Sequence, residues 1–129
     1  MFYADQHMHS SVSFDSHSPR PDMAAAAVQV GLSALCFTDH YDVVDEHGAF
    51  VRTYDWAPAH EAHAQAKAAW GDRIFLGFGI EVGNAPEDFS AAEQVFENFL
   101  KVPVNDRKAF RKDSLHLLCQ RGDKVFQFP

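Results

Sequence analysis

The chain opens with Phe2-Tyr3-Ala4-Asp5-Gln6-His7-Met8-His9, an apolar start that runs into a carboxylate and two histidines. If this stretch is an extended strand, its side chains alternate between two faces, so His7 and His9 share one face and Asp5 lies on the same side. Two imidazoles a few ångströms apart on one face can hold a cation between them. The alternative is a solvated strand end with two incidental histidines, and the rest of the sequence has to decide between the two.

The composition predicts one acidic domain over residues 1–129. Of the 129 residues, 47% are apolar, which is enough for one domain with a real core and too few to argue for two. Eleven Lys and Arg stand against 18 Asp and Glu, a formal net charge of −7. Such a surface repels phosphodiester backbones and suits a protein that concentrates cations, so we expect no nucleic-acid partner.

The cysteines and the hydropathy predict a soluble cytoplasmic protein. Cys36 and Cys119 are the two cysteines, they form no C-x-x-C motif, and we expect both to be reduced thiols. No apolar run approaches the roughly 20 residues of a membrane span. The N-terminus lacks the charged and apolar regions of a signal peptide. We therefore expect no membrane partner.

Strand patterns and helix patterns alternate along the chain. Apolar runs typical of strands occupy residues 2–9, 32–38, 73–81 and 114–119, and helix-forming segments separate them at about 22–30, 57–70 and 86–100. The segment after residue 119 reads as a turn and an abrupt end. This order predicts an α/β fold with about four parallel strands and right-handed crossovers, open or curled into a barrel.

Potential metal ligands fall at the ends of these expected strands. In parallel α/β folds the chemistry gathers at the carboxyl ends of the strands. The donors that reach this edge, strand by strand, are His7 and His9, then Asp39 and His40, then Glu81, then His116. Four consecutive strand ends with a nitrogen or oxygen donor are hard to explain as incidental solvent-exposed residues, so the sequence predicts a metal site.

Other polar residues leave alternatives open. His60 and His63 lie three apart on the expected second helix, where they read as a metal pair or, preferably, as a solvated helix face. His17 supplements Asp15 at a metal or is simply solvated. Arg20 contacts a substrate phosphate or lies on the surface.

Three motifs, in this order, resemble the PHP (polymerase and histidinol phosphatase) metal-dependent phosphoesterases. They are Asp5-Gln6-His7-Met8-His9-Ser10 with Ser13-Phe14-Asp15, Phe37-Thr38-Asp39-His40-Tyr41-Asp42, and Gly79-Ile80-Glu81-Val82-Gly83. Ser114-Leu115-His116-Leu117-Leu118 resembles the fourth motif, although Asp113 stands where glycine is common. Within the family, the first and third motifs look most like monofunctional histidinol-phosphatases.

The resemblance implies a distorted seven-stranded β/α barrel with two to three divalent metal ions at its rim. The implied ligands are His7 and His9 for a first metal, Glu81 and His116 for a second that Glu81 bridges to the first, and Asp15 and His40 for a third. Asp5 and Asp39 would orient imidazoles from outside this ligand set. Mixed histidine and carboxylate ligands suit Zn²⁺, Mn²⁺ or Fe, and the sequence does not separate these metals.

The implied activity is hydrolysis of a small phosphate monoester, L-histidinol phosphate to histidinol and phosphate, in histidine biosynthesis. Clustered metals lower the pKa of a bridging water, hold the phosphate and neutralise charge on the leaving group. Family members are longer than this chain, which looks like a C-terminally truncated N-terminal half. A partial barrel has an open edge strand, through which we expect self-association.

Three rival functions remain in view. A nuclease-type PHP module uses the same metals, but the acidic charge argues against a nucleic-acid substrate. An amidohydrolase also places His-x-His on its first strand, yet commonly adds a carboxylated lysine, and no lysine here sits convincingly at a strand end. The third is an inactive or partner-dependent metal-binding fragment. A Ser-His-Asp hydrolase lacks its Gly-x-Ser-x-Gly motif here.

Overall fold

The computed structural model describes residues 1–45, 47–51, 53–101, 117–121 and 124–128. The chain divides into two compact units. The first unit comprises Met1–His40 and Asp55–Ile80, and the second comprises Tyr41–Tyr54 and Glu81–Pro129.

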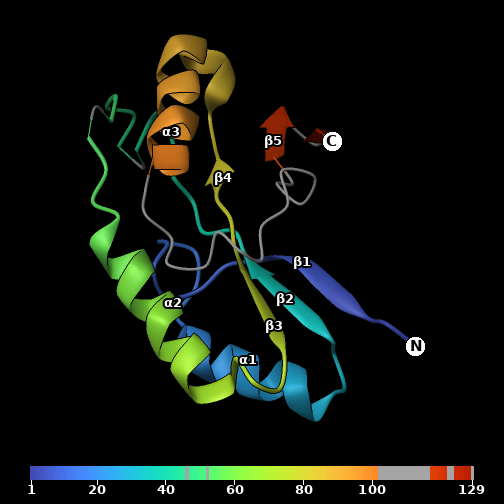
Figure 1. The fold of residues 1–129 in the computed structure, drawn as a ribbon. Helices are drawn as coiled ribbons and strands as arrows, with labels where there is room; N and C mark the ends of the chain where they lie inside the picture. The colour runs from blue at the N-terminus through green and yellow to red at the C-terminus, as the bar shows by residue number, and fades with distance from the viewer. Residues whose placement is uncertain (46, 52, 102–116, 122–123, 129) are drawn as a thin grey trace. The chain divides into compact units, whose positions relative to one another are not determined.

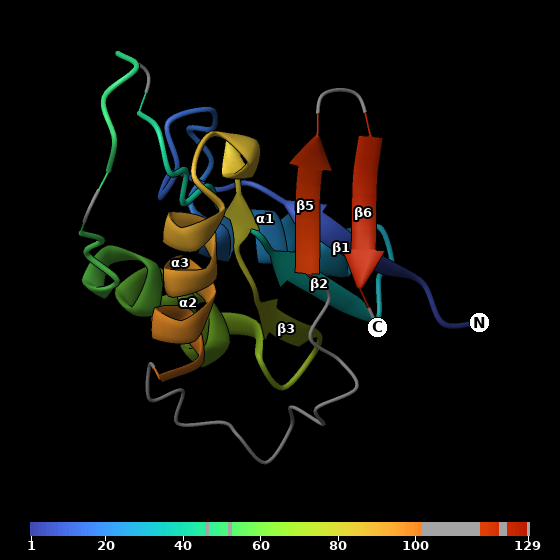
Figure 2. The ribbon, with the colours of Figure 1, turned by 90° about the horizontal axis from the view of Figure 1, so that it is seen from above.

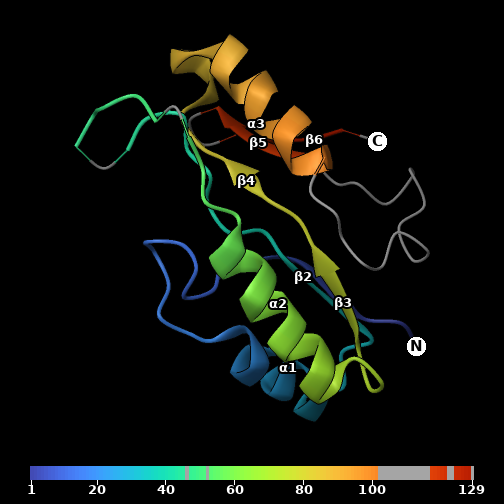
Figure 3. The same ribbon diagram turned by 60° about the vertical axis from the view of Figure 1, so that its left-hand side comes forward.

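A three-stranded parallel sheet and two helices form the first unit. The strands are β1 (Ala4–Met8), β2 (Ala34–Phe37) and β3 (Phe75–Phe78), hydrogen-bonded in the order β1-β2-β3 (Figure 1). Helix α1 (Arg20–Gln29) connects β1 to β2, and α2 (Ala57–Trp70) belongs to the connection from β2 to β3. The two helices lie side by side against one face of the sheet (Figure 3). Parallel strands with helical crossovers place the carboxyl ends of β1 and β2 at the same edge.

The sequence explains where these helices begin and how closely they pack. Each has a proline in its first turn, where the missing N–H removes no helical hydrogen bond. Alanines then dominate both helices, and small side chains allow close packing on the sheet. Seven buried residues form the hydrophobic core of this unit, namely Ala24, Ala27, Leu35, Phe37, Ala66, Ile74 and Leu76.

A glycine permits the close approach of β2 and β3. Gly77 pairs with Cys36 in the parallel register, and a Cβ added at Gly77 would lie 2.9 Å from Cys36 Sγ. A side chain at this position would collide with Cys36, so the absence of a Cβ at Gly77 allows the two strands to pair here.

The second unit contains a short mixed sheet and a helix. Strand β4 (Glu81–Val82) pairs in parallel with β5 (Leu117–Arg121), and β5 pairs antiparallel with β6 (Lys124–Phe128) (Figure 2). A 3-10 helix, η1 (Ala85–Glu87), and helix α3 (Phe89–Lys101) follow β4.

The α/β class and the order of the first five elements agree with the sequence analysis, and three details differ. The expected strand over 73–81 is two strands, β3 and β4, which belong to different sheets. The first unit has three parallel strands, and the further parallel pairing, β4 with β5, is in the second unit. Strand β6 follows the turn that the sequence predicted, and it was missed because a five-residue run does not by itself distinguish a strand from a loop. Among the described residues, no helix has both the length and the apolar character needed to cross a membrane.

Candidate metal centre

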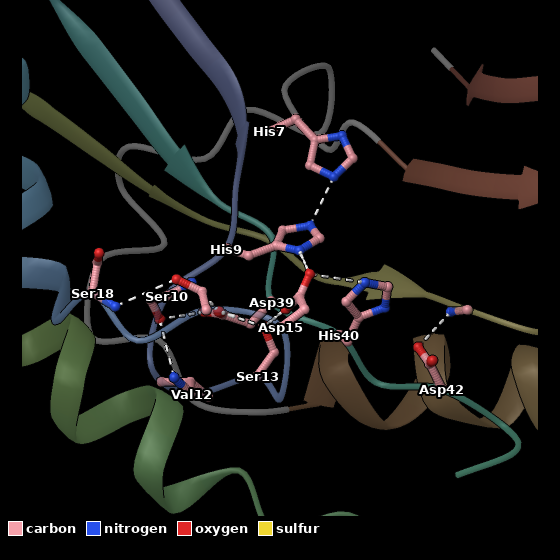
Figure 4. Close-up of polar contacts among 12 residues, drawn as sticks. His7, His9, Ser10, Val12, Ser13, Asp15, Ser18, Asp39, His40 and Asp42 are labelled. Atoms are coloured by element: carbon pink, nitrogen blue, oxygen red, sulfur yellow. Dashed lines mark hydrogen bonds and ion pairs between the residues drawn. The ribbon is translucent and has the colours of Figure 1, made fainter. Parts of the chain in front are cut away.

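His7 and His9 face one another at the end of β1. His7 lies in the strand and His9 directly follows its last residue. The Nε2 atoms of the two rings are 2.8 Å apart, and the ring centroids are 4.9 Å apart (Figure 4). Two ring nitrogens that face the same space are arranged as two ligands of one cation would be.

Asp15 returns to this strand end through the loop between β1 and α1. Its Oδ2 lies 2.5 Å from His9 Nδ1 and 3.5 Å from Nε2 of His40, which follows β2 (Figure 4). The donor atoms of His9, Asp15 and His40 lie within 4.8 Å of one another, a spacing that could hold a metal ion. The Asp15 side chain is 32% exposed, so the cluster is open to solvent and solutes.

His9 presents a different nitrogen to each neighbour. Its Nδ1 faces the Asp15 carboxylate and its Nε2 faces His7. A neutral imidazole carries one N–H and one lone pair. If Nδ1–H donates to Asp15, the lone pair stays on Nε2, which is how a carboxylate fixes the tautomer of a metal-binding histidine. The second lone pair of the same Asp15 oxygen is available to a cation beside His40.

The electrostatics of the cluster keep Asp15 ionised. Partial burial acts to raise the pKa of Asp15, but hydrogen bonds from His9 and Ser13, with the charges of His9 and His40, lower it below its ordinary value of 3.8. Metal binding requires a deprotonated carboxylate, so Asp15 is in the required state near neutral pH.

Asp39 does not have the role that we expected from the sequence. Its buried carboxylate accepts hydrogen bonds from the Ser10 backbone N–H (2.5 Å), the Ser10 hydroxyl (2.8 Å), the Ser13 hydroxyl (3.0 Å) and Arg20 Nη2 (2.6 Å). Four donors occupy the roughly four lone-pair directions of a carboxylate. Asp39 therefore orients no imidazole among the described residues. Burial acts to raise its pKa, but the hydrogen bonds and charge of Arg20 and the bonds from Ser10 lower it.

Asp5 likewise contacts backbone rather than an imidazole. Its Oδ1 accepts a hydrogen bond of 3.1 Å from the backbone N–H of His7. Among the described residues, the Asp5 side chain makes this one hydrogen bond. The bond fixes the backbone at His7 and does not orient the imidazole ring of His7. The pairing of β1 with β2 also changes register between Asp5 and Met8.

Arg20 is buried, contrary to both readings of the sequence. Its guanidinium pairs with Asp39, donates from Nη1 to the carbonyl of Ala59 (3.0 Å), and lies 4.9 Å and 5.0 Å from the ring centroids of Phe37 and Phe78. With 1% relative exposure it reaches neither the surface nor a substrate phosphate. The sequence missed this placement because Arg20 precedes the expected helix, and an arginine in a loop is usually solvated.

His60 and His63 form neither a solvated face nor a metal pair. His63 is 6% exposed and stacks on Phe78 with centroids 5.1 Å apart, and His60 meets the same ring edge-on at 5.0 Å. Burial, then the charge of Arg20, lowers the pKa of His63 to about 3. Among the described residues, His60 Nε2 and His63 Nδ1 have no hydrogen-bond partner. The periodicity of a helix did not reveal that this face packs on β3.

The third motif is explained in part by contacts within the second unit. The backbone carbonyl of Glu81 accepts a hydrogen bond of 2.8 Å from the N–H of Tyr41. The N–H of Gly83 donates to Asp42 Oδ1 at 3.0 Å, and the Asp42 carboxylate occupies the space that a Cβ at residue 83 would need. Glu81 as a metal ligand stays a prediction, and His116 lies outside the described residues.

Ser10 and Ser13 are the residues that sequence reasoning overlooked. Both lie in the first motif, between His9 and Asp15, and both are buried. Their position inside a ligand-bearing loop was the available signal, because a serine buried next to a charged group is hydrogen-bonded in most proteins.

A parallel α/β sheet whose strand ends bring together histidines and a carboxylate defines an α/β protein with a candidate metal centre. Comparison with protein-family profiles matches residues 5–126 to the PHP domain. The chain belongs to the PHP domain family, as its motifs predicted. Its three-stranded parallel sheet is part of the (β/α) barrel of that family.

Among solved structures, the chain is similar to histidinol phosphate phosphatase from Lactococcus lactis subsp. lactis Il1403, determined in complex with zinc, L-histidinol and phosphate. The two share 28% sequence identity with a TM-score of 0.62, over 74% of this chain and 35% of the other. This chain thus spans about a third of the length of that phosphatase. A search of curated proteins found no significant match.

Proposed function

We propose that this chain provides part of a metal-dependent phosphoesterase that hydrolyses L-histidinol phosphate to histidinol and phosphate. The observation that carries the proposal is the cluster of His9, Asp15 and His40 beside His7, at the carboxyl ends of two parallel strands. The similar solved phosphatase, which holds zinc, L-histidinol and phosphate, supports the choice of substrate. A role in histidine biosynthesis, a cytoplasmic location and self-association belong to the same proposal.

The ligand set follows the geometry and the motifs. His7 and His9 would hold a first cation through their facing Nε2 atoms, and Asp15 with His40 would hold another. Glu81 and His116 complete the proposed set of two to three metals. Nitrogen and carboxylate donors suit Zn²⁺, Mn²⁺ and Fe, and the zinc of the similar phosphatase favours Zn²⁺.

The residues of this chain contribute position and charge rather than a nucleophile. Bound divalent cations would lower the pKa of a water and bind phosphate oxygens. Asp15 keeps the Nδ1 proton on His9, so that Nε2 remains a donor of electrons. The anionic Asp15 also offsets positive charge at the centre. The open side of the cluster, where Asp15 is exposed, is where a small phosphate ester can enter.

Phosphate release by the full chain tests the proposal. The metal-free chain is loaded with Zn²⁺ or Mn²⁺, and phosphate release from L-histidinol phosphate is compared with removal of nucleotides from the 3′ end of an oligonucleotide. We expect the histidinol ester to be preferred and the activity to disappear with a chelator. Equal or better turnover of the oligonucleotide would favour the nuclease-type alternative. Metal binding without turnover of either substrate would favour the metal-binding fragment.

A further inference from the structure

A buried polar network connects the core of the first unit to the candidate metal centre. Its members are Ser10, Ser13, Arg20 and Asp39, and each is at least nine-tenths buried. Buried polar groups of this kind destabilise a fold unless all are hydrogen-bonded, so the contacts of each member are informative.

Arg20 is fixed at one end of the network. All three guanidinium nitrogens have partners: Nη2 donates to Asp39 Oδ2 (2.6 Å), Nε to Ser10 Oγ (3.2 Å) and Nη1 to the Ala59 carbonyl (3.0 Å). Both side chains of the ion pair have 0% exposure. The guanidinium carbon also lies 4.9 Å and 5.0 Å from the ring centroids of Phe37 and Phe78, which further restrict its position. Arginine suits such a site because its fork of donors is rigid.

Asp39, held by Arg20, in turn holds the loop that carries Asp15 by hydrogen bonds. It accepts both the backbone N–H and the hydroxyl of Ser10, the residue that follows His9. It also accepts the hydroxyl of Ser13, whose Oγ lies 3.0 Å from Asp39 Oδ1 and 2.8 Å from Asp15 Oδ1. One hydroxyl proton is thus shared between a buried and an exposed carboxylate.

The Ser13 contact selects the orientation of Asp15. Because Oδ1 of Asp15 is held by Ser13, Oδ2 is the oxygen that faces His9 and His40 (Figure 4). We propose that the buried Arg20–Asp39 pair is a positioning device for the metal centre and acts on Asp15 through the Ser13 hydroxyl. This inference rests on the proposed function in one respect, namely that the cluster of His9, Asp15 and His40 binds a cation.

Stability alone is a weak explanation of the network. Replacing a buried ion pair by apolar side chains is often neutral or stabilising. A metal ligand, in contrast, has to be held within about 0.5 Å of its working position. Partners of metal ligands typically change metal affinity about 10-fold to 100-fold when they are removed.

Zinc affinity of the metal-free full chain tests the inference. Zn²⁺ is titrated in competition with a chromophoric chelator, and the site in question is the one that Asp15→Asn removes. Ser13→Ala breaks the contact with Asp15 while Arg20 and Asp39 stay in place. We expect it to weaken this site about 10-fold. Ser18→Ala is the matched control, since Ser18 is an exposed serine of the same loop, and it should stay within about twofold. Equal zinc affinity of the two variants would overturn the inference.

A second pair of variants tests the route from Arg20 to Asp15. Arg20→Lys should weaken the same site, and should weaken it little further when Ser13→Ala is already present, because both act on one contact. If the double variant loses zinc affinity by the full product of the two single-variant factors, the proposed route is overturned. If Arg20→Lys does not fold, the comparison of Ser13→Ala with Ser18→Ala decides alone. A chain that binds zinc at this site and releases no phosphate contradicts the proposed function and leaves this inference standing.

Discussion

Two pairs of neighbouring histidines in the first unit have opposite surroundings. His7 and His9 stand at the carboxyl end of β1, where their ring nitrogens face each other and an ionised carboxylate. His60 and His63 stand on α2, where their rings pack against Phe78. His9 contacts the Asp15 carboxylate, which favours a nearby cation. His63 lies near the cationic Arg20, which disfavours a second cation.

The comparison teaches that spacing alone does not define a metal site. Both pairs have the short sequence separation that metal sites use. What separates them is the partner: an imidazole next to a carboxylate keeps a lone pair oriented outward, whereas a buried imidazole against an aromatic ring is held neutral. The two pairs therefore respond differently to mutation, acid and metal.

The largest effect is expected when the first pair is broken. His9→Asn removes a nitrogen that faces His7 and the contact with Asp15. Removing residues next to metal ligands already costs about 10-fold to 100-fold, so loss of His9 should lower zinc-dependent release of phosphate by more than about 100-fold. Steady-state assays against His47→Asn, an exposed histidine outside the proposed ligand set, measure it. Activity of His9→Asn equal to that of the control would place the centre elsewhere.

Acid should reveal the second pair. The pKa of His63 is about 3 in the folded chain and ordinarily 6.5, so the unfolded chain binds more protons between these values. Its contribution to stability is therefore complete above pH 6.5 and is lost as the pH falls towards 3. From pH 6.5 to 5 the loss should be about 2 kcal/mol. Urea unfolding of the metal-free chain measures it.

His63→Leu provides the control for this pH dependence, because leucine is apolar and does not titrate. The unfolding free energy of the original chain minus that of His63→Leu should fall by about 2 kcal/mol from pH 6.5 to pH 5. A difference that is constant between pH 7 and 5 would mean that His63 protonates as easily in the folded chain as in the unfolded one.

The smallest effect is expected at the exposed edge of the metal centre. Phe14 is 63% exposed and its ring centroid lies 5.0 Å from that of His40. Phe14→Ala removes one wall beside this imidazole without uncovering a core. Unfolding free energy should change by no more than about 0.5 kcal/mol, as for most surface substitutions. Thermal unfolding measures this change. Zinc titration measures the metal affinity of the variant, and an affinity lowered as far as in Ser13→Ala would show that Phe14 also positions the centre.

Much of the fold followed from the sequence because its signals are local. The run from Ala57 to Trp70 contains good helix formers, a proline in its first turn and a glycine after its last residue, and the helix has these bounds. The break between β3 and β4 was missed because Gly79 and Ile80 continue an apolar pattern, and only pairing with other strands separates the two.

The candidate site was predictable by residue type and not by contact. The strand ends predicted that His7, His9 and His40 lie at one edge, and the family resemblance added Asp15. The structure places donor atoms of His9, Asp15 and His40 within 4.8 Å of one another. The family resemblance implied that Asp39 orients an imidazole. The real partners, Arg20 and Ser13, depend on how α1 and its preceding loop pack on β2, which no local pattern encodes.

Calorimetric titration of the metal-free full chain with zinc chloride tests the central claim most directly. The original chain and His63→Leu should bind zinc with the same stoichiometry and affinity. His9→Asn should lose at least one equivalent, because its two nitrogens face the other ligands of the centre. Zinc binding by His9→Asn that matches the original chain in stoichiometry and affinity would contradict a metal centre at this end of the sheet.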